Sequence, residues 1–243
     1  MHPLLEQKLQ GQRLLLAVAS PVEVRGVFAA FDDSAPVPPL WGVTSLGRVD
    51  VLHTGVGKAN AAGALASHLA HHIYGAVVNV GIAGSLPGPG TRLVPGGIIA
   101  ATGCAFADEG LVTPDGYRSL SAMGFPMDPT LAPTSTGHTE VFPTDAVLAG
   151  AFRCVVDAES VIATVSTCSG TDAAARVVVE RTGALAEAME GAALALVARR
   201  CGVAFCEVRA ISNFTGDRAA QGWDIAGALA RLGDALRRVV VER

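Results

Sequence analysis

The sequence has few charged and few aromatic residues, and it lacks runs of basic residues. Charged residues make up 16% of the 243 residues and aromatic ones 5%, while 18 Lys plus Arg stand against 22 Asp plus Glu, a net charge of −4. Because a nucleic-acid site needs a basic patch, we expect no nucleic-acid partner. The chain is nevertheless 50% hydrophobic and contains 28 Gly. Such small aliphatic material excludes a disordered chain and favours an α/β fold.

Long apolar runs are also missing. The runs at residues 76–83 and 97–101 are far shorter than the ~20 residues that a membrane span needs. The first residues, Met1 to Glu6, contain an early acid and lack the basic and apolar regions of a secretory signal. We therefore expect no membrane partner and a cytoplasmic location.

Paired cysteines and metal-ligand clusters are absent from the sequence pattern. The five cysteines are an odd number without a C-x-x-C pair, which argues against a disulfide framework or a zinc knuckle and favours buried free thiols. His68, His71 and His72 have a spacing that can bind metal, but no acid or thiol accompanies them. Histidines also suit the last turn of a helix, so we expect no metal site there.

Strand-like and helix-like patterns alternate without a linker, so we expect one domain over residues 1–243. Apolar runs predict strands at residues 14–19, 49–52, 76–82, 97–104, 161–166 and 204–211. Helical patterns lie at residues 21–30, 58–73, 172–181, 191–200 and 224–240. This alternation is typical of a sheet with parallel pairs and right-handed crossovers. Ligand sites in such sheets lie at the carboxyl ends of the strands.

The segment Ser20-Pro21-Val22-Glu23 directly follows the first predicted strand. Ser at the N-cap, Pro at N1 and Glu at N3 form a capping box, which alone explains Glu23. The alternative is a carboxylate at the carboxyl edge of the sheet that acts as a base. The residues by themselves favour the cap.

Two glycine-containing segments also follow predicted strands. Residues 54–60 lack the third Gly of a dinucleotide loop and the spacing of a Walker loop, but their glycines allow backbone N–H groups to approach a phosphate or a sugar hydroxyl. Residues 79–84 place glycines where the backbone comes close to a turn or to a flat ligand.

Two charged residues stand in apolar surroundings. Glu190, next to Met189, precedes an Ala-rich helix, where it is either a surface acid favoured by the helix dipole or a pocket residue that accepts sugar hydroxyls. Arg209 lies in a predicted buried strand and needs a partner. Strand alternation puts Glu207 on the same face, so the two pair in the simplest interpretation. In the alternative, Arg209 holds a water molecule or Glu23.

Together these segments resemble the nucleoside phosphorylase and nucleosidase superfamily. The resemblance spans nearly the whole chain and rests on Glu23 and on residues 55–58, 79–84, 188–193 and 208–213. The length and arrangement are most similar to the methylthioadenosine/S-adenosylhomocysteine nucleosidase branch. Residues 209–218, followed by Trp223-Asp224-Ile225, resemble the futalosine hydrolases of menaquinone biosynthesis.

The resemblance implies a fold, a reaction and an assembly. The fold is a central mixed sheet flanked by helices, and the reaction is hydrolysis of futalosine to hypoxanthine and dehypoxanthine futalosine. It also implies a homodimer or larger homo-oligomer and no metal or organic cofactor.

The resemblance further implies roles for individual residues. Glu23 is the general base for water, Arg209 positions the water and Glu23, and Asn213 meets the purine. Substrate contacts are expected from Val56, Gly81, Met189, Glu190 and Ser212, with Glu190 accepting ribose hydroxyls. Asp217 is a reserve acid for the leaving group or otherwise a turn residue. Arg218 is expected to meet the benzoate carboxylate of futalosine.

The chain departs from the nucleosidase pattern at two positions. Adenine-specific members carry Asp where this chain has Asn213, and Ser where it has Ile82. An amide is not an acid, but its oxygen accepts a hydrogen bond from a proton on purine N7 while its NH2 donates to O6. Asn213 therefore favours a 6-oxopurine such as hypoxanthine over adenine. Ile82 lacks the hydroxyl that contacts the water.

Three alternatives stay open. A phosphorylase would bind phosphate at the loop of residues 55–58, where no clear Arg/His cluster accompanies the glycines. A nucleosidase of the methylthioadenosine type would release adenine. A regulatory module would bind a nucleoside without turnover, although base-, sugar- and water-facing residues occurring together favour an enzyme.

Overall fold

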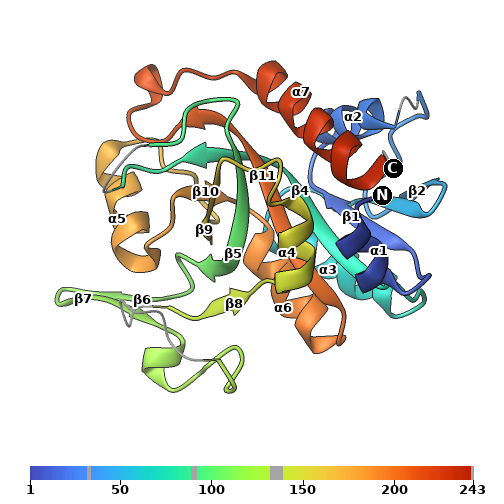
Figure 1. The fold of residues 1–243 in the computed structure, drawn as a ribbon. Helices are drawn as coiled ribbons and strands as arrows, with labels where there is room; N and C mark the ends of the chain where they lie inside the picture. The colour runs from blue at the N-terminus through green and yellow to red at the C-terminus, as the bar shows by residue number, and fades with distance from the viewer. Residues whose placement is uncertain (32–33, 89–91, 132–138, 242–243) are drawn as a thin grey trace.

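The computed structural model describes residues 1–31, 34–88, 92–131 and 139–241. Its centre is a mixed sheet with the strand order β10-β9-β5-β11-β4-β1-β3-β2 and with β8 beside β5 (Figure 1). The strands are β1 (Leu14–Val18), β2 (Val43–Leu46), β3 (Val49–His53), β4 (Ala76–Ser85), β5 (Ile98–Phe106), β8 (Val141–Pro143), β9 (Ala158–Thr164), β10 (Ala186–Ala188) and β11 (Ala204–Phe214). The hairpin of β6 (Gly110–Thr113) and β7 (Gly116–Ser119) forms a separate two-stranded sheet.

The sheet closes on itself at one end. Strand β10 pairs in parallel with β9 and antiparallel with β4, so β4, β11, β5, β9 and β10 form a ring. Strands β1 and β3 extend the sheet in parallel beyond β4, and β2 adds an antiparallel edge. The ring places the short strand β10 beside the adjacent carboxyl ends of β4 and β11.

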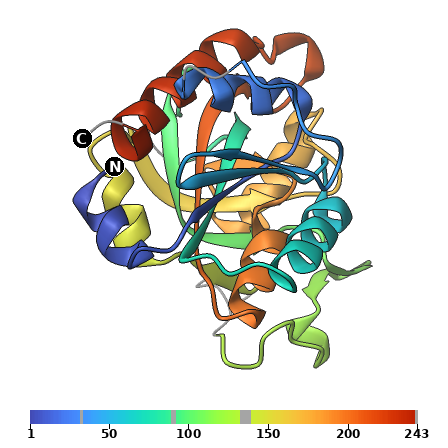
Figure 2. The same cartoon turned by 90° about the vertical axis from the view of Figure 1, so that its right-hand side faces the viewer.

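Helices cover both faces of the sheet. They are α1 (Pro3–Leu9), α2 (Pro21–Ala30), α3 (Lys58–Leu69), α4 (Ala146–Phe152), α5 (Asp172–Thr182), α6 (Gly191–Arg200) and α7 (Ile225–Leu236). Helices α2 and α7 lie side by side over one face, and α3 packs with α6 on the other (Figure 2). The two termini meet on one side, where the His2 N–H donates to the Val239 carbonyl at 2.7 Å.

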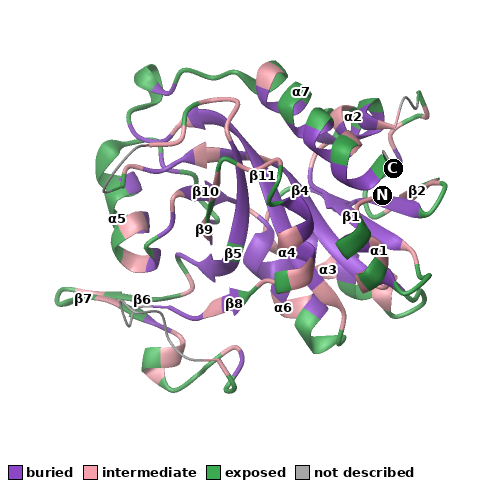
Figure 3. Ribbon diagram, in the orientation of Figure 1, coloured by how far each residue is buried: buried purple, intermediate pink, exposed green. Residues whose placement is uncertain are grey.

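The core explains why the strands appear in the sequence as unbroken apolar runs. Alternate residues of β1 point to opposite faces, so Leu14 and Leu16 pack in the layer of α2 and α7 while Leu15 and Ala17 pack in the layer of α3 and α6. Figure 3 shows the central strands buried along most of their length. Burial on both faces removes the polar alternation of a half-exposed strand.

The predicted α/β class and all the predicted strands and helices are confirmed; α2 and α6 have the predicted bounds, and the other elements differ at one or both ends. Strands β4 and β11 run on to Ser85 and Phe214. Helix α3 ends at Leu69 rather than at Ile73, whose 81% exposure shows that the extra turn would bury no apolar surface. Helix α7 ends at Leu236 and is followed by a π-helical turn to Val241.

The described cysteines are all free, but the expectation that they are buried is only partly right. Cys104 and Cys206 lie inside the sheet and are buried, whereas Cys154, Cys168 and Cys201 are exposed. The exposed three lie outside the core strands, Cys201 as the C-cap of α6 and Cys168 in the loop after β9. Because these three thiols are exposed, they contribute little to the hydrophobic core.

Of the three histidines, only His68 lies on α3, because the helix ends at Leu69 and His71 and His72 follow it. His68 Nε2 lies 2.8 Å from the Tyr74 hydroxyl, which donates to Asp50 at 2.7 Å, and the His68 ring stacks on His72. Across the described ranges, no group of three His, Cys, Asp or Glu side chains is arranged to hold a metal ion. Within the same ranges, every helix is too short or too polar to cross a bilayer.

Candidate active site

A cavity of about 460 Å³ opens at the carboxyl ends of β1, β4, β10 and β11. Its position is the one expected for a ligand site in a sheet with parallel strands. Its lining includes Glu23, Val56, Ile82, Gly84, Ser169, Glu187, Met189, Glu190, Arg209, Ser212, Asn213, Arg218, Gln221 and Trp223. The structure thus brings together most of the site residues predicted from the sequence.

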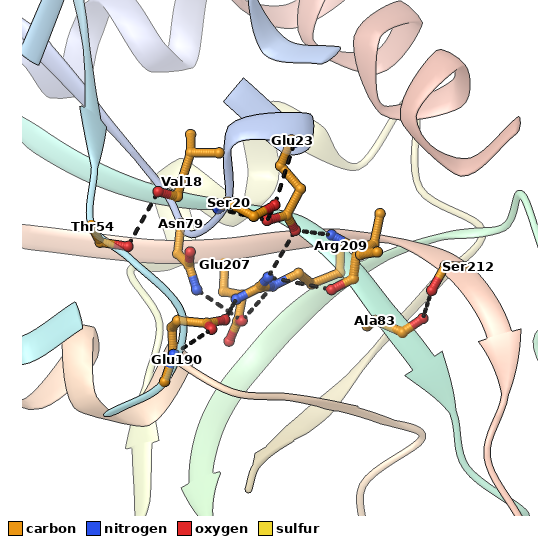
Figure 4. A network of polar contacts seen from close by, with 12 residues as sticks. Val18, Ser20, Glu23, Thr54, Asn79, Ala83, Glu190, Glu207, Arg209 and Ser212 are labelled. Atoms are coloured by element: carbon orange, nitrogen blue, oxygen red, sulfur yellow. Dashed lines mark hydrogen bonds and ion pairs between the residues drawn. The ribbon is translucent and has the colours of Figure 1, made fainter. Parts of the chain in front are cut away.

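Arg209 is the centre of the polar network (Figure 4). Its side chain is 1% exposed. Its Nε donates to Glu207 Oε1 at 2.8 Å, and its Nη2 donates to Glu190 Oε2 at 3.0 Å. Its Nη1 lies 4.0 Å from Glu23 Oε1. The predicted pairing with Glu207 is therefore confirmed, and the guanidinium also approaches Glu23 as the alternative requires.

Glu207 and its partners fix the orientation of Arg209. The Glu207 carboxylate is fully buried and accepts hydrogen bonds from Asn79 Nδ2 at 2.9 Å and from the Cys104 thiol. The carboxylates of Glu207, Glu190 and Glu23 raise the pKa of Arg209, against the effect of burial. The guanidinium consequently stays charged inside the protein.

Glu23 is both a helix cap and a cavity residue. Its Oε2 accepts the Ser20 N–H at 3.0 Å and the Ser20 hydroxyl at 2.6 Å, which completes the predicted capping box at the start of α2. Its Oε1 accepts the Ile82 N–H at 2.9 Å and faces Arg209. Burial raises the pKa of Glu23, and the Arg209 charge and the Ser20 hydroxyl only partly oppose the rise. The two interpretations of Glu23 are therefore compatible.

Gly81 does not line the cavity and lies instead against the side chains of Glu23 and Arg209. A Cβ on this residue would lie 2.6 Å from Arg209 Nη1 and closer still to Glu23 Oε1. Real Cβ atoms do not approach other atoms so closely, and the residue is buried. Gly81 is needed because its missing side chain lets Glu23 and Arg209 meet.

We expect Gly81→Ala to lower kcat by about 10²-fold, because a displacement of catalytic groups by about 1 Å costs this much. The measurement is kcat together with the melting temperature. The matched control is Gly150→Ala in helix α4, since a Cβ on Gly150 makes an ordinary contact at 3.4 Å with the side chain of Leu4 in α1. Unchanged kcat in Gly81→Ala would contradict the close approach.

Glu190 joins the cavity to the loop after β3. Its Oε1 accepts the Gly57 N–H at 3.0 Å. Lys58 contacts the carboxylates of Asp108 and Glu109. Val56 lies at the rim of the cavity and is 50% exposed, and Met189 lines the cavity next to Glu190. The loop groups that would hold a phosphate are thus engaged by carboxylates.

Asn213 and Ser212 form the other end of the cavity. Asn213 is 4% exposed; its Oδ1 accepts the Ser212 hydroxyl at 2.9 Å and its Nδ2 donates to the Phe214 carbonyl at 2.8 Å. A shift of register between Ile211 and Asn213 interrupts the regular pairing of β11 with β4. The amide keeps one lone pair on its oxygen and one N–H for a ligand.

The segment after β11 covers this end; the exposed Arg218 lines the cavity, and Asp217 does not. Arg218 Nη1 donates to Gln221 Oε1 at 2.9 Å, and its guanidinium lies over the Trp223 ring. Asp217 is exposed, and its backbone N–H donates to Asp172 Oδ1 at 3.2 Å. The structure therefore does not bring the Asp217 carboxyl to the site.

The sequence interpretation missed the acid Glu187 and its partner Ser169. Glu187 Oε1 accepts the Ser169 N–H at 2.7 Å and its Oε2 accepts the Ser169 hydroxyl at 2.6 Å. Burial raises the pKa of Glu187, and these two hydrogen bonds oppose the rise. The sequence does show an acid three residues before Glu190. The strand that carries this acid, β10, has only three residues and no pattern that predicts a strand.

Comparisons with known proteins agree with this geometry. The sequence model of the family described as the phosphorylase superfamily matches residues 42–242. The chain is similar to the futalosine hydrolase of Acidothermus cellulolyticus, 36% identical over 225 residues that cover 90% of this chain and 86% of that protein. It is also similar to the futalosine hydrolase of Streptomyces coelicolor, 34% identical over 236 residues that cover 93% of this chain and 94% of that protein.

A solved structure shows the same fold. It is a mutant of the Helicobacter pylori enzyme abbreviated MTAN, crystallised with 5′-methylthioadenosine in its active site. The TM-score is 0.73 at 21% identity, and the match covers 95% of this chain and 98% of that one. The predicted central mixed sheet flanked by helices is confirmed by this likeness.

Proposed function

Because the chain belongs to the phosphorylase superfamily and its curated relatives are named hydrolases, we propose that it hydrolyses the N-glycosidic bond of futalosine. The products are hypoxanthine and dehypoxanthine futalosine, in menaquinone biosynthesis. The observation that carries the choice of substrate is the buried Asn213 amide at one end of the cavity, with an acceptor and a donor available.

The end of the cavity around Arg209, Glu23 and Glu190, which we call the sugar end, supplies the groups that the reaction needs. The C1′–N9 bond breaks through a ribosyl centre with oxocarbenium character, and the oxygen of water forms the new bond to C1′. Glu23 takes the proton from that water, and Arg209 holds Glu23 in place. Glu190, fixed by Arg209 and Gly57, accepts the ribose hydroxyls, with Met189 against the sugar.

The opposite end, formed by Asn213 and Ser212 and called the base end, receives the leaving purine. The electron pair of the C1′–N9 bond stays on the purine, which gains a proton at N7 from solvent water because Asn213 is not an acid, and Glu23 returns its proton to solvent. Asn213 Oδ1 accepts the hydrogen bond from N7–H, and its free N–H donates to O6. A buried polar site discriminates strongly against a ligand that mispairs with it. Adenine, with an amino group in place of O6, would mispair with this amide.

Phosphorolysis is the second candidate, and the loop of residues 55–58 argues against it. Lys58 contacts two carboxylates, and the Gly57 N–H donates to Glu190. A phosphate at this loop would meet acids that repel it. We therefore expect base release in phosphate-free buffer, at a rate that added phosphate does not raise.

Arg218 is proposed to bind the benzoate carboxylate of futalosine. We expect Arg218→Ala to raise KM for futalosine by about 10- to 100-fold with little change in kcat, because one hydrogen bond between charged groups is lost. The measurement is steady-state kinetics with futalosine and with inosine, which lacks the benzoate. Inosine is expected to keep its KM.

The matched control is Arg176→Ala, an exposed arginine of α5 that does not line the cavity. It should change neither constant. An unchanged KM for futalosine in Arg218→Ala would remove Arg218 from the substrate site.

A further inference from the structure

Glu187 lies in the cavity and has no role in the reaction as proposed above. Its side chain belongs to β10 and is 5% exposed. Ser169 donates one hydrogen bond to each carboxylate oxygen. Each oxygen of a carboxylate has a further lone pair, so the group is held as an acceptor with capacity to spare.

The strand register places Glu187 opposite Asn213. Both residues are paired with Gly84, Glu187 from β10 and Asn213 from β11, and the two strands flank β4. Their backbones are therefore about 9–10 Å apart, two strand spacings, with both side chains in the cavity. The Glu187 carboxylate and the Asn213 amide therefore reach the cavity from strands on opposite sides of β4.

Gly84 keeps the floor between the two side chains open. A Cβ on Gly84 would lie 2.8 Å from Thr215 Cγ2 and 3.6 Å from Asn213 Nδ2. A larger residue would thus fill the space beside the Asn213 amide. The glycine at the end of a buried strand is explained by a flat ligand passing over it.

The same register separates this end from the sugar end. Along β4, Gly81 pairs with Arg209 and Gly84 pairs with Asn213. Glu23 and Glu190 gather around Arg209, whereas Glu187 pairs with Gly84. Glu187 consequently belongs to the base end of the cavity.

We propose that Glu187 accepts a hydrogen bond from N1–H of the purine and selects, together with Asn213, a 6-oxopurine leaving group. This inference rests on the proposed function. From N7 through position 6 to N1, the leaving 6-oxopurine presents a donor, an acceptor and a donor. Asn213 supplies an acceptor and a donor, and Glu187 supplies the last acceptor. Adenine has a lone pair on N1, which faces the carboxylate unfavourably.

A purely structural role for Glu187 makes a different prediction. Glu187 anchors Ser169, whose carbonyl accepts hydrogen bonds from Gln221 Nε2 at 3.1 Å and from the Gly216 N–H at 3.3 Å. If holding Ser169 were the whole role of Glu187, loss of its carboxylate would loosen the segment after β11 that covers the cavity. All substrates would then lose activity by the same factor.

The test is the ratio of kcat/KM for futalosine to kcat/KM for its 6-amino counterpart, in wild type and in Glu187→Gln. Gln keeps an oxygen for Ser169 and offers an N–H to N1 of adenine. We expect the ratio to fall at least about tenfold. Ser169→Ala is the control, because it weakens the anchor and keeps the carboxylate. Its ratio should stay within about twofold of wild type.

Binding of free bases keeps the inference testable if Glu187→Gln is inactive. Wild type is expected to bind hypoxanthine at least about tenfold more tightly than 1-methylhypoxanthine, which lacks the N1–H, and the variant should lose most of that difference. An unchanged ratio in Glu187→Gln, or equal binding of the two bases by wild type, would overturn the inference. Failure of wild type to release hypoxanthine from futalosine would instead overturn the proposed function.

Discussion

Replacing Glu23 with Gln is expected to lower kcat by about 10²–10⁴-fold, the usual contribution of a general base, and to leave the fold intact. The amide cannot take a proton from water. It can still accept the Ser20 N–H, because Gln serves at N3 of a capping box as Glu does. The measurement is kcat with futalosine, together with the melting temperature.

The pH dependence gives the same prediction a second readout. The base must be ionised, and burial raises the pKa of Glu23 above its ordinary value. The kcat/KM of wild type should therefore fall as the pH drops through that raised pKa, and Glu23→Gln should lose this limb. Glu180→Gln, at an exposed position of α5, is the matched control and should behave as wild type. A Glu23→Gln variant with more than about a tenth of wild-type kcat would contradict the role of Glu23.

Replacing Asn213 with Asp is expected to lower kcat/KM for futalosine by about 10²–10³-fold and to favour the 6-amino counterpart. A carboxylate has no N–H for O6, and it leaves the Phe214 carbonyl without its donor. When protonated, it can donate to N7 of adenine. The measurement is kcat/KM for both substrates.

Asn60→Asp is the matched control for this substitution. Asn60 Nδ2 also donates to a backbone carbonyl, that of Val56 at 3.0 Å, but Asn60 does not line the cavity. The control should keep the preference for the 6-oxopurine. If Asn213→Asp kept it too, base selection would have to come from elsewhere in the cavity.

Much of the fold could be predicted because burial leaves a local pattern. The strands of the ring and β1 are apolar on both faces, so runs such as Leu14–Val18 stand out in the sequence. The ends of these runs located Glu23 and Asn213, since ligand sites lie at the carboxyl ends of parallel strands. The local cap at Ser20 was equally visible.

The rest depends on contacts between distant residues. Strand β10 has three residues, and its pairing with β4 is what puts Glu187 in the cavity. Spacing alone did not predict that Arg209 contacts Glu190 or that Gly81 makes room for both Glu23 and Arg209. Likewise, Asp217 and Arg218 are neighbours in the chain, but only Arg218 lines the cavity.

The most direct test of the proposed function is hydrolysis of futalosine in phosphate-free water labelled with ¹⁸O. We expect that wild type releases hypoxanthine, that the label appears on the anomeric carbon of the ribosyl product, and that Glu23→Gln loses this activity. Release that requires phosphate, or preferential release of adenine from the 6-amino counterpart, would contradict it.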